Sequence, residues 1–376
     1  MNPELLEHTD GLSLVDHHCH GLLSRELELS EFELFATESE WDSPVGTSVF
    51  DSPFGIAVRA ECAPLLGLER HCNGEACIRQ RALLGPAEVN TLLLRASGIG
   101  RYIVETGITN GQLLDPKELA EAAQASSSFV VRLETVAERL LEAEDSVETF
   151  AARFEEALDG LSGAVGYKTI VAYRGGLDFD PDRPTTKELH IALGEVFASR
   201  NRGQRIRLAN SVVIRHLIWS AIDRKKPLQF HIGYGDGDID LFRCDPTRMT
   251  EFIRRTRTSG SQIMLLHCYP FHREAGFLAQ IYPHVYLDTG AAINYTGLGS
   301  VQVIRESLEL APFHKVLFST DTYGLPELYL CGARLWRRGI AAVFSDWVEA
   351  DGIGLADAKR YITMIGSDNA ERVYGV

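Results

Sequence analysis

Short apolar runs that end in polar residues recur along the chain, and several of them are separated by longer segments with helical spacing. Strands buried on both faces of a parallel sheet read as nearly continuous apolar runs of this kind. The segment 146–161 shows the helical pattern, because Phe150, Phe154 and Leu158 recur every four residues while glutamates occupy the other face. Eight runs fit the strand pattern, at residues 12–20, 100–108, 128–136, 165–174, 226–235, 261–269, 284–290 and 315–322.

Eight strands that alternate with helices predict an α/β fold, a closed (β/α)8 TIM barrel. A doubly wound open sheet is the alternative, but no glycine-rich phosphate-binding sequence follows the first run, which favours the barrel. Residues 22–96 break the rhythm and predict a helical insertion after strand 1. Loops that follow barrel strands gather over the face that carries the site, so we expect this insertion to form a lid or a subunit contact. A decorative helical insertion is the alternative, and we expect residues 1–376 to form one domain.

The composition narrows the class of protein. The chain has 376 residues, of which 45% are hydrophobic and 24% charged, so it can bury a large core. Its formal net charge of −15 argues against nucleic acid and anionic membrane surfaces as partners, and no apolar stretch is long enough to span a bilayer. Seven scattered cysteines favour reduced thiols over a disulfide framework. We therefore expect a cytoplasmic protein that acts on a small molecule.

Residues with metal-binding chemistry end four of the eight runs. His18 and His20 lie two residues apart in the first run, so a strand places them on one face. His231, His267 and Asp321 end the fifth, sixth and eighth runs. A lone buried histidine is more often a core residue than a ligand, but the carboxyl ends of barrel strands converge on one mouth, where these five side chains should meet. Imidazole and carboxylate together suit Zn²⁺, and also Mn²⁺ or Fe²⁺.

This ordered set resembles that of the amidohydrolase superfamily, which has His-x-His on strand 1, histidines on strands 5 and 6 and aspartate on strand 8. The amidohydrolase-related branch (amidohydrolase 2) is more closely similar. That branch includes the amidohydrolase-like domain fused to glutamine-synthetase-like domains in some fungal and bacterial proteins. The resemblance covers nearly the whole chain and is weakest over residues 22–96. It is carried by the segments VDHHCH, GYKTIVAYRGGL, LLHCYPFHREAGFLA, VYLDTG, VLFSTDTYGLPE and GSDNAERVYG.

The resemblance implies a divalent metal held by His18, His20, His231 and Asp321, with one Zn²⁺ ion favoured over two. Such a metal lowers the pKa of a bound water from about 15.7 towards 7. Asp321 would accept the proton of that water and pass it to the leaving group, although a turn or helix-capping role is its alternative. His267 would ligate a second metal or donate a hydrogen bond to the substrate carbonyl.

Lys168, on the fourth run, has two alternatives. Binuclear amidohydrolases use a carbamylated lysine at the end of strand 4 to bridge two metals, and Lys168 matches that strand. The other alternative is an unmodified ammonium that holds a substrate carboxylate or the metal-bound oxygen. We favour the unmodified lysine beside a single metal.

Residues that follow strands four and six are candidates for substrate binding, because an arginine fork binds carboxylate through two hydrogen bonds. They are Tyr173, Arg174, His272 and Arg273.

Four further acidic residues follow or lie within the predicted strands. We expect Glu105, Glu134 and Asp288 to support the site from behind, and Asp16 to orient a ligand histidine or to buttress the barrel.

Three functions fit these residues. The first is a metal-dependent hydrolase that cleaves the C–N bond of a small carboxylate-bearing substrate, for which a γ-glutamyl amide is a reasonable choice. The second keeps the site but decarboxylates its substrate or isomerises a uronate, since the same metal can act as a Lewis acid. The third is a non-catalytic metal-binding scaffold. In each case we expect the barrel to form a homo-oligomer, a dimer.

Overall fold

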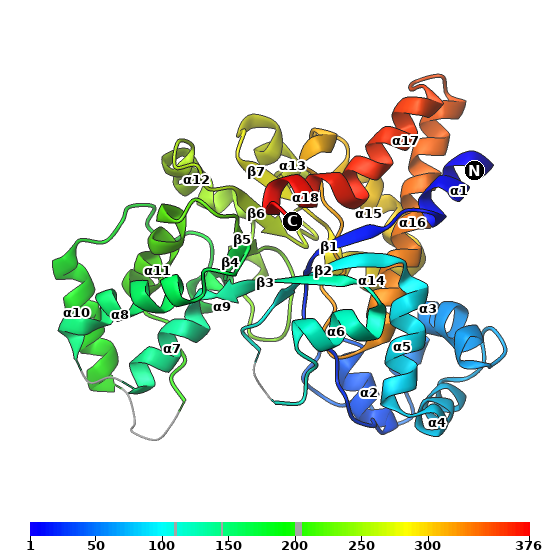
Figure 1. Ribbon diagram of the computed structural model, residues 1–376, viewed down its shortest axis with the longest axis horizontal. Helices are drawn as coiled ribbons and strands as arrows, with labels where there is room; N and C mark the ends of the chain where they lie inside the picture. Colours follow the sequence, from blue (N-terminus) through cyan, green and yellow to red (C-terminus); the bar gives the residue numbers. More distant parts are fainter. Residues whose placement is uncertain (109–110, 144–145, 200–204) are drawn as a thin grey trace.

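The computed structural model describes residues 1–376 apart from 109–110, 144–145 and 200–204. A curled parallel sheet lies at the centre of the described residues, and helices surround it (Figure 1). Its seven strands are hydrogen-bonded in chain order, so each crossover returns the chain to the neighbouring position. The strands are β1 (Leu14–Cys19), β2 (Ile99–Glu105), β3 (Ser126–Arg132), β4 (Gly166–Thr169), β5 (Leu228–His231), β6 (Ile263–Leu266) and β7 (Val285–Leu287).

An irregular segment joins β7 to β1 and completes the ring. Val316 forms a single parallel bridge with Leu287, and the Leu317 amide donates to the Leu287 carbonyl at 3.0 Å. On the other side, the His17 amide donates to the Phe318 carbonyl at 3.2 Å. The prediction of an α/β barrel fold is confirmed, but the prediction of eight regular strands is wrong by one.

The eighth run is irregular because side chains take over hydrogen bonds that a strand ladder would make. The Thr320 amide donates to Asp16 Oδ1 at 3.0 Å, a carboxylate in place of a backbone carbonyl. Asp321 follows with a φ of 52°, a left-handed conformation that no strand contains. Apolar pattern alone does not reveal this change of backbone.

Eighteen α-helices lie in the described part of the chain. The helix expected over 146–161 forms as Val147–Gly160, with Phe150, Phe154 and Leu158 buried as predicted. The helices are α1 (Pro3–Asp10), α2 (Leu29–Phe35), α3 (Pro53–Ala57), α4 (Gly74–Leu84), α5 (Pro86–Ser97), α6 (Pro116–Ala123), α7 (Leu133–Ala143), α8 (Val147–Gly160), α9 (Val171–Gly175), α10 (Thr186–Ser199), α11 (Ser211–Asp223), α12 (Thr250–Thr256), α13 (His272–Ile281), α14 (Gly290–Thr296), α15 (Ser300–Ser307), α16 (Pro326–Glu349), α17 (Leu355–Thr363) and α18 (Asn369–Tyr374).

The insertion after β1 is helical, as the sequence predicts. It comprises α2 to α5 with the short 3₁₀ helices η1 (Val49–Asp51) and η3 (Ala63–Leu66) and the π-helix η2 (Val58–Cys62). Its helix α5 packs against α16, the longest helix described. No helix in the described ranges is long and apolar enough to cross a membrane.

Candidate active site

The carboxyl ends of the strands open into a cavity of about 520 Å³. Its floor carries the histidines that end β1, β5 and β6, and part of its wall comes from the insertion after β1. Seven residues singled out by the sequence line it, namely His18, His20, Lys168, Tyr173, His231, His267 and Asp321. The predicted convergence of distant strand ends on one mouth is confirmed.

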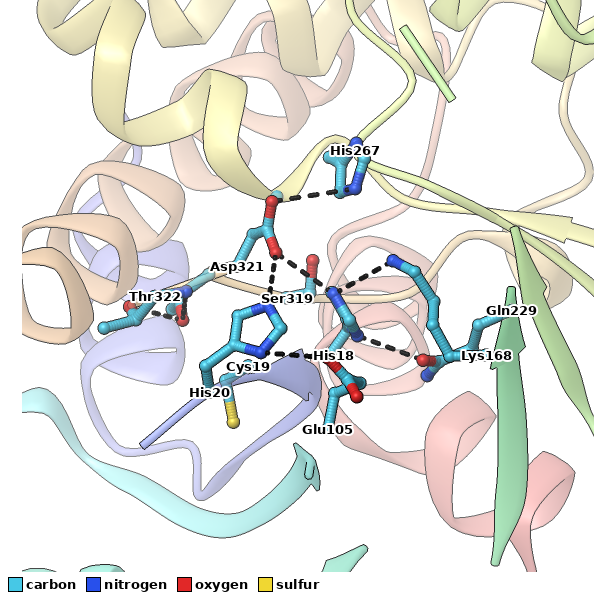
Figure 2. A network of polar contacts seen from close by, with 12 residues as sticks. His18, Cys19, His20, Glu105, Lys168, Gln229, His267, Ser319, Asp321 and Thr322 are labelled. Carbon is cyan, nitrogen blue, oxygen red and sulfur yellow. Dashed lines mark hydrogen bonds and ion pairs between the residues drawn. The ribbon is translucent and has the colours of Figure 1, made fainter. Parts of the chain in front are cut away.

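Three of the four predicted metal ligands form a compact group. One ligand atom each from His18, His20 and Asp321 lies within 4.8 Å of the others. Asp321 Oδ1 is 3.1 Å from His18 Nε2 and 3.6 Å from His20 Nε2 (Figure 2). Strand alternation brings the two histidines together, because Cys19 between them turns to the other side, where its Sγ donates to the Ile103 carbonyl at 3.7 Å.

The protonation states of His18 and Asp321 suit a cation. Burial would lower the pKa of His20, but its contacts with Asp321 and Glu105 raise it. Burial, aided by the charge of Lys168, lowers the pKa of His18 to about 3, so its imidazole is neutral near pH 7. Burial would raise the pKa of Asp321, but the adjacent His267, His18 and His20 hold it well below its ordinary range. Neutral imidazole and ionised carboxylate are the forms that bind divalent metals.

A second layer of side chains orients His18, on β1, and His20, which follows the strand. Gln229 on β5 lies 3.0 Å from His18 Nδ1, and Glu105 at the end of β2 lies 3.3 Å from His20 Nδ1. Glu105 also pairs with Arg132 on β3. Partners of this kind fix ring orientation and raise the basicity of metal-ligating histidines.

His231 lines the cavity but lies outside the three-residue group. Its ring stands 4.2 Å from that of His267, measured between centroids. The side chain is 6% exposed, and its Nε2 finds no hydrogen-bond partner among the described residues. A buried polar atom without a partner is costly, and this nitrogen is available to bind a ligand in the cavity.

The hydrogen bonds of His267 determine its tautomer and therefore what its second nitrogen can do in the cavity. Its Nδ1 donates to the Ile232 carbonyl at 2.9 Å, and its Nε2 lies 3.6 Å from Asp321 Oδ2. Burial lowers the pKa of His267. In the neutral ring the only proton is therefore on Nδ1, so Nε2 can accept a proton or bind a metal but cannot donate to a substrate carbonyl.

Lys168 lies deep in the site rather than at the rim. It is 3% exposed, and its Nζ is 3.4 Å from His18 Nε2. Burial lowers its pKa to about 8. Lys168 is thus the cavity-lining side chain best placed to donate a hydrogen bond beside the histidine and aspartate group.

Three of the four predicted substrate-binding residues do not line the cavity. Arg174, on the short helix α9, pairs with Glu138 at 3.5 Å instead of lining the cavity. His272 and Arg273 begin α13 and pair with Glu306 at 2.7 and 3.0 Å, which binds α13 to α15.

Tyr173 does line the cavity, with its ring 4.4 Å from the ring of His231. The sequence places Tyr173 and Arg174 together after β4, but the turn of α9 sends their side chains in different directions.

The supporting acidic residues are structural, with one difference from expectation. Glu134 lies in the first turn of α7 rather than on a strand, and accepts from the Thr169 hydroxyl at 2.6 Å. Asp288 accepts from the His267 amide at 2.9 Å, and Asp16 accepts from Thr320.

Several cavity residues escape sequence reasoning. Glu38 comes from the insertion and Tyr295 from α14, and a hydrogen bond joins them. Burial, together with the charge of Asp321, raises the pKa of Glu38 to about 7. Asp236 and Tyr234 follow β5, whose glycine-rich loop was the only signal available. Nothing in the segment around Glu38 marks it as part of a site.

Comparison with known proteins agrees with this geometry. The sequence profile of the amidohydrolase family matches residues 134–376. Protein fluG of Emericella nidulans is 31% identical over 241 residues, which make up 60% of this chain but only 28% of fluG. The match therefore spans little more than a quarter of that relative.

Solved structures share the whole architecture. A protein from Lactobacillus casei ATCC 334, proposed to be a metal-dependent hydrolase, has a TM-score of 0.84 and 28% identity, covering 99% of this chain and 97% of its own. A uronate isomerase from Bacillus halodurans C-125 has a TM-score of 0.68 and 11% identity over 99% of this chain and 95% of its own, a similarity of fold alone. The profile match, which extends over more than half of the sequence, shows that the chain belongs to the amidohydrolase family and is a hydrolase of that family.

Proposed function

We propose that the chain hydrolyses a C–N amide bond in a small carboxylate-bearing substrate, with a γ-glutamyl amide as the first candidate. The observation that carries the proposal is the meeting of His18, His20 and Asp321 within 4.8 Å at the floor of the cavity. A single Zn²⁺ ion is the metal we favour, and His231, with its unpaired Nε2, is the fourth ligand.

The donor atoms fit a cation. Both Asp321 Oδ1 and the lone pair of a neutral His18 Nε2 are acceptors, yet they face each other at 3.1 Å. Two acceptors at this distance repel unless a positive charge lies beside them, and Lys168 Nζ, 3.4 Å from His18 Nε2, supplies part of that charge. Two imidazoles and one carboxylate form an N/O donor set that suits zinc, and a bound divalent ion supplies activated water and polarises a carbonyl.

The chain's own residues then divide the work. Asp321, ionised and 17% exposed at its side chain, accepts the proton of the attacking water and returns it to the leaving nitrogen. Lys168 donates to the oxyanion that develops on the carbonyl oxygen, the role for which the His267 tautomer is unsuited.

The cavity's charge distribution favours a substrate with both a carboxylate and an ammonium group. Lys168 and Arg132 line it from β4 and β3, whereas Glu38 and Asp236 line it from the insertion and the loop after β5. The α-carboxylate and α-amino groups of a γ-glutamyl amide present these two charges. The resemblance to domains joined to glutamine-synthetase-like partners points to the same substrates.

The test is release of glutamate from a panel of γ-glutamyl amides by the zinc-loaded chain. Turnover that Asp321→Asn abolishes, and that Arg273→Gln leaves intact, supports the proposal. Arg273 is a matched control because it is an exposed ion-pairing residue outside the cavity. No turnover of any amide by the metal-replete chain contradicts it.

Decarboxylation or uronate isomerisation at the same site is the alternative. Its observational basis is the shared fold of the uronate isomerases. Release of carbon dioxide, or aldose–ketose conversion without incorporation of ¹⁸O from labelled water, distinguishes these reactions from hydrolysis. The dimer stays a prediction, which light scattering would test. The single domain with a lid at residues 22–96 also stays a prediction.

A further inference from the structure

A continuous chain of hydrogen bonds connects His18 to the helix α18, on the side of the ring opposite Asp321. His18 Nδ1 lies 3.0 Å from Gln229 Oε1 (Figure 2), and Gln229 Nε2 lies 2.8 Å from the Tyr374 hydroxyl. The same hydroxyl lies 3.1 Å from His17 Nδ1, and His17 Nε2 lies 2.9 Å from Asp288 Oδ2.

The direction of every hydrogen bond in this chain follows from one carbonyl group. The backbone oxygen of His17 can only accept, and it lies 3.0 Å from the Gln229 side chain, so the group facing it is the amide nitrogen. The Gln229 oxygen must then face His18 Nδ1, and that nitrogen must carry the proton. In the neutral imidazole, His18 Nε2 is left as a lone pair directed at Asp321.

The Tyr374 hydroxyl is the second hydrogen-bond acceptor of the Gln229 amide nitrogen. Its oxygen accepts from Gln229 Nε2, so its own proton is available to His17 Nδ1. His17 Nε2–H then donates to Asp288, whose other oxygen accepts from the His267 amide. Each N–H and O–H hydrogen of this network has its own acceptor, and Gln229 Nε2 uses its two hydrogens for the His17 carbonyl and the Tyr374 hydroxyl.

Water has little access to this network of hydrogen bonds. Gln229, His17 and Asp288 are fully buried, and Tyr374 is 6% exposed. A group removed from the chain is therefore not replaced by solvent, and its former partner must reorient or remain unpaired.

We propose that Gln229 and Tyr374 are positioning residues that hold His18 in the tautomer required for metal binding. The inference rests on the metal site of the proposed function but not on its substrate. Removing the Tyr374 hydroxyl deletes one of the hydrogen bonds that oppose rotation of the Gln229 amide. A rotated amide presents its NH₂ group to His18 Nδ1 and moves the ring proton to Nε2, where it blocks the metal.

The experiment measures the Zn²⁺ affinity of the metal-free protein by competition with a chromophoric chelator. Gln229→Leu and Tyr374→Phe are compared with the control variant Tyr102→Phe. This control removes the hydroxyl of another buried tyrosine, on β2, that takes no part in the hydrogen-bond network. Changes in the outer contacts of a metal-ligating histidine typically cost 10–100-fold in affinity. We expect the Zn²⁺ Kd to rise by about that factor in Gln229→Leu and by roughly tenfold in Tyr374→Phe, and to stay within about twofold in Tyr102→Phe.

A purely structural role gives a different pattern. Thermal unfolding of the apo proteins, measured in parallel, would then show a lower Tm for Tyr374→Phe and Gln229→Leu with an unchanged Zn²⁺ Kd, which overturns the inference. If Tyr374→Phe does not fold, the affinity of Gln229→Leu decides. Absence of zinc binding by the unaltered chain overturns both the inference and the metal site. Altered Kd values in a chain that hydrolyses no γ-glutamyl amide uphold the inference and contradict only the proposed substrate.

Discussion

Asp321 has the most demanding position of any single residue in the site. Its φ of 52° and the donation of its amide to the His18 carbonyl at 3.1 Å fix the carboxylate between His18 and His20. Asp321→Asn keeps this shape but removes the charge that accepts a proton. We expect turnover to fall by roughly 10²–10⁴-fold, the usual contribution of a general base. Steady-state kinetics at saturating zinc measure this, and retention of more than half of the activity would contradict the role.

Lys168 separates the two chemical alternatives that the sequence leaves open. If it acts as an unmodified ammonium beside one metal, activity is independent of added bicarbonate, and Lys168→Met lowers kcat by roughly 10²–10³-fold. A carbamylated lysine instead requires carbon dioxide, and bicarbonate then restores activity to protein prepared in its absence. Kinetics with and without bicarbonate distinguish the two, and bicarbonate dependence would replace our single-metal account with a binuclear one.

Sequence reasoning at this scale found the residues that end strands and missed those that reach the cavity from elsewhere. His18 and His20 are found because period-two alternation is visible in six letters. Glu38 is missed because its place depends on how the insertion folds back over β1, which no local pattern encodes. Arg174 lies outside the cavity that Tyr173 lines, because successive residues of a helix point about 100° apart and only Tyr173 faces the site.

Among the secondary-structure elements, β7 and the irregular segment 316–322 depend on one carboxylate. Asp288 accepts from the Ser319 hydroxyl at 2.7 Å and from the Gly290 amide at 2.7 Å, and it pairs with His17 on β1. These contacts explain how the ring is held together where the regular ladder ends. The sequence could not reveal them, because an apolar run predicts a strand whether or not a carboxylate replaces part of its ladder.

This carboxylate predicts a specific acid sensitivity. Burial opposes ionisation of Asp288, but the hydrogen bond from His17 lowers its pKa to about 2, below the usual value of 3.8. A lowered folded-state pKa stabilises the fold above the unfolded-state pKa, and that contribution is lost as the pH falls from about 4 towards 2. The shift corresponds to about 2 kcal/mol. We expect Asp288→Asn to lower the free energy of unfolding by about this amount at pH 7 and to flatten its decline below pH 4. Urea unfolding at several pH values measures it, and identical profiles would contradict the assignment.

The whole molecule is a barrel whose site is assembled from strand ends distant in sequence, which is why the ordered set of histidines and aspartate was more informative than any single motif. A metal bound only by the folded barrel must stabilise it globally. At a free zinc concentration of about 100 times the Kd, the free energy of unfolding should rise by about 2.7 kcal/mol. Thermal unfolding with and without a chelator measures this increase. An unchanged Tm would mean that the ligands meet equally well in the unfolded chain or not at all.

The central claim is that His18, His20 and Asp321 hold one divalent ion. Elemental analysis of the purified chain beside the double variant His18→Ala/His20→Ala tests it most directly. The account predicts close to one equivalent of zinc, manganese or iron in the unaltered chain and almost none in the variant, with both proteins folded. Metal that persists in the variant, or none in the unaltered chain even after reconstitution, would contradict it.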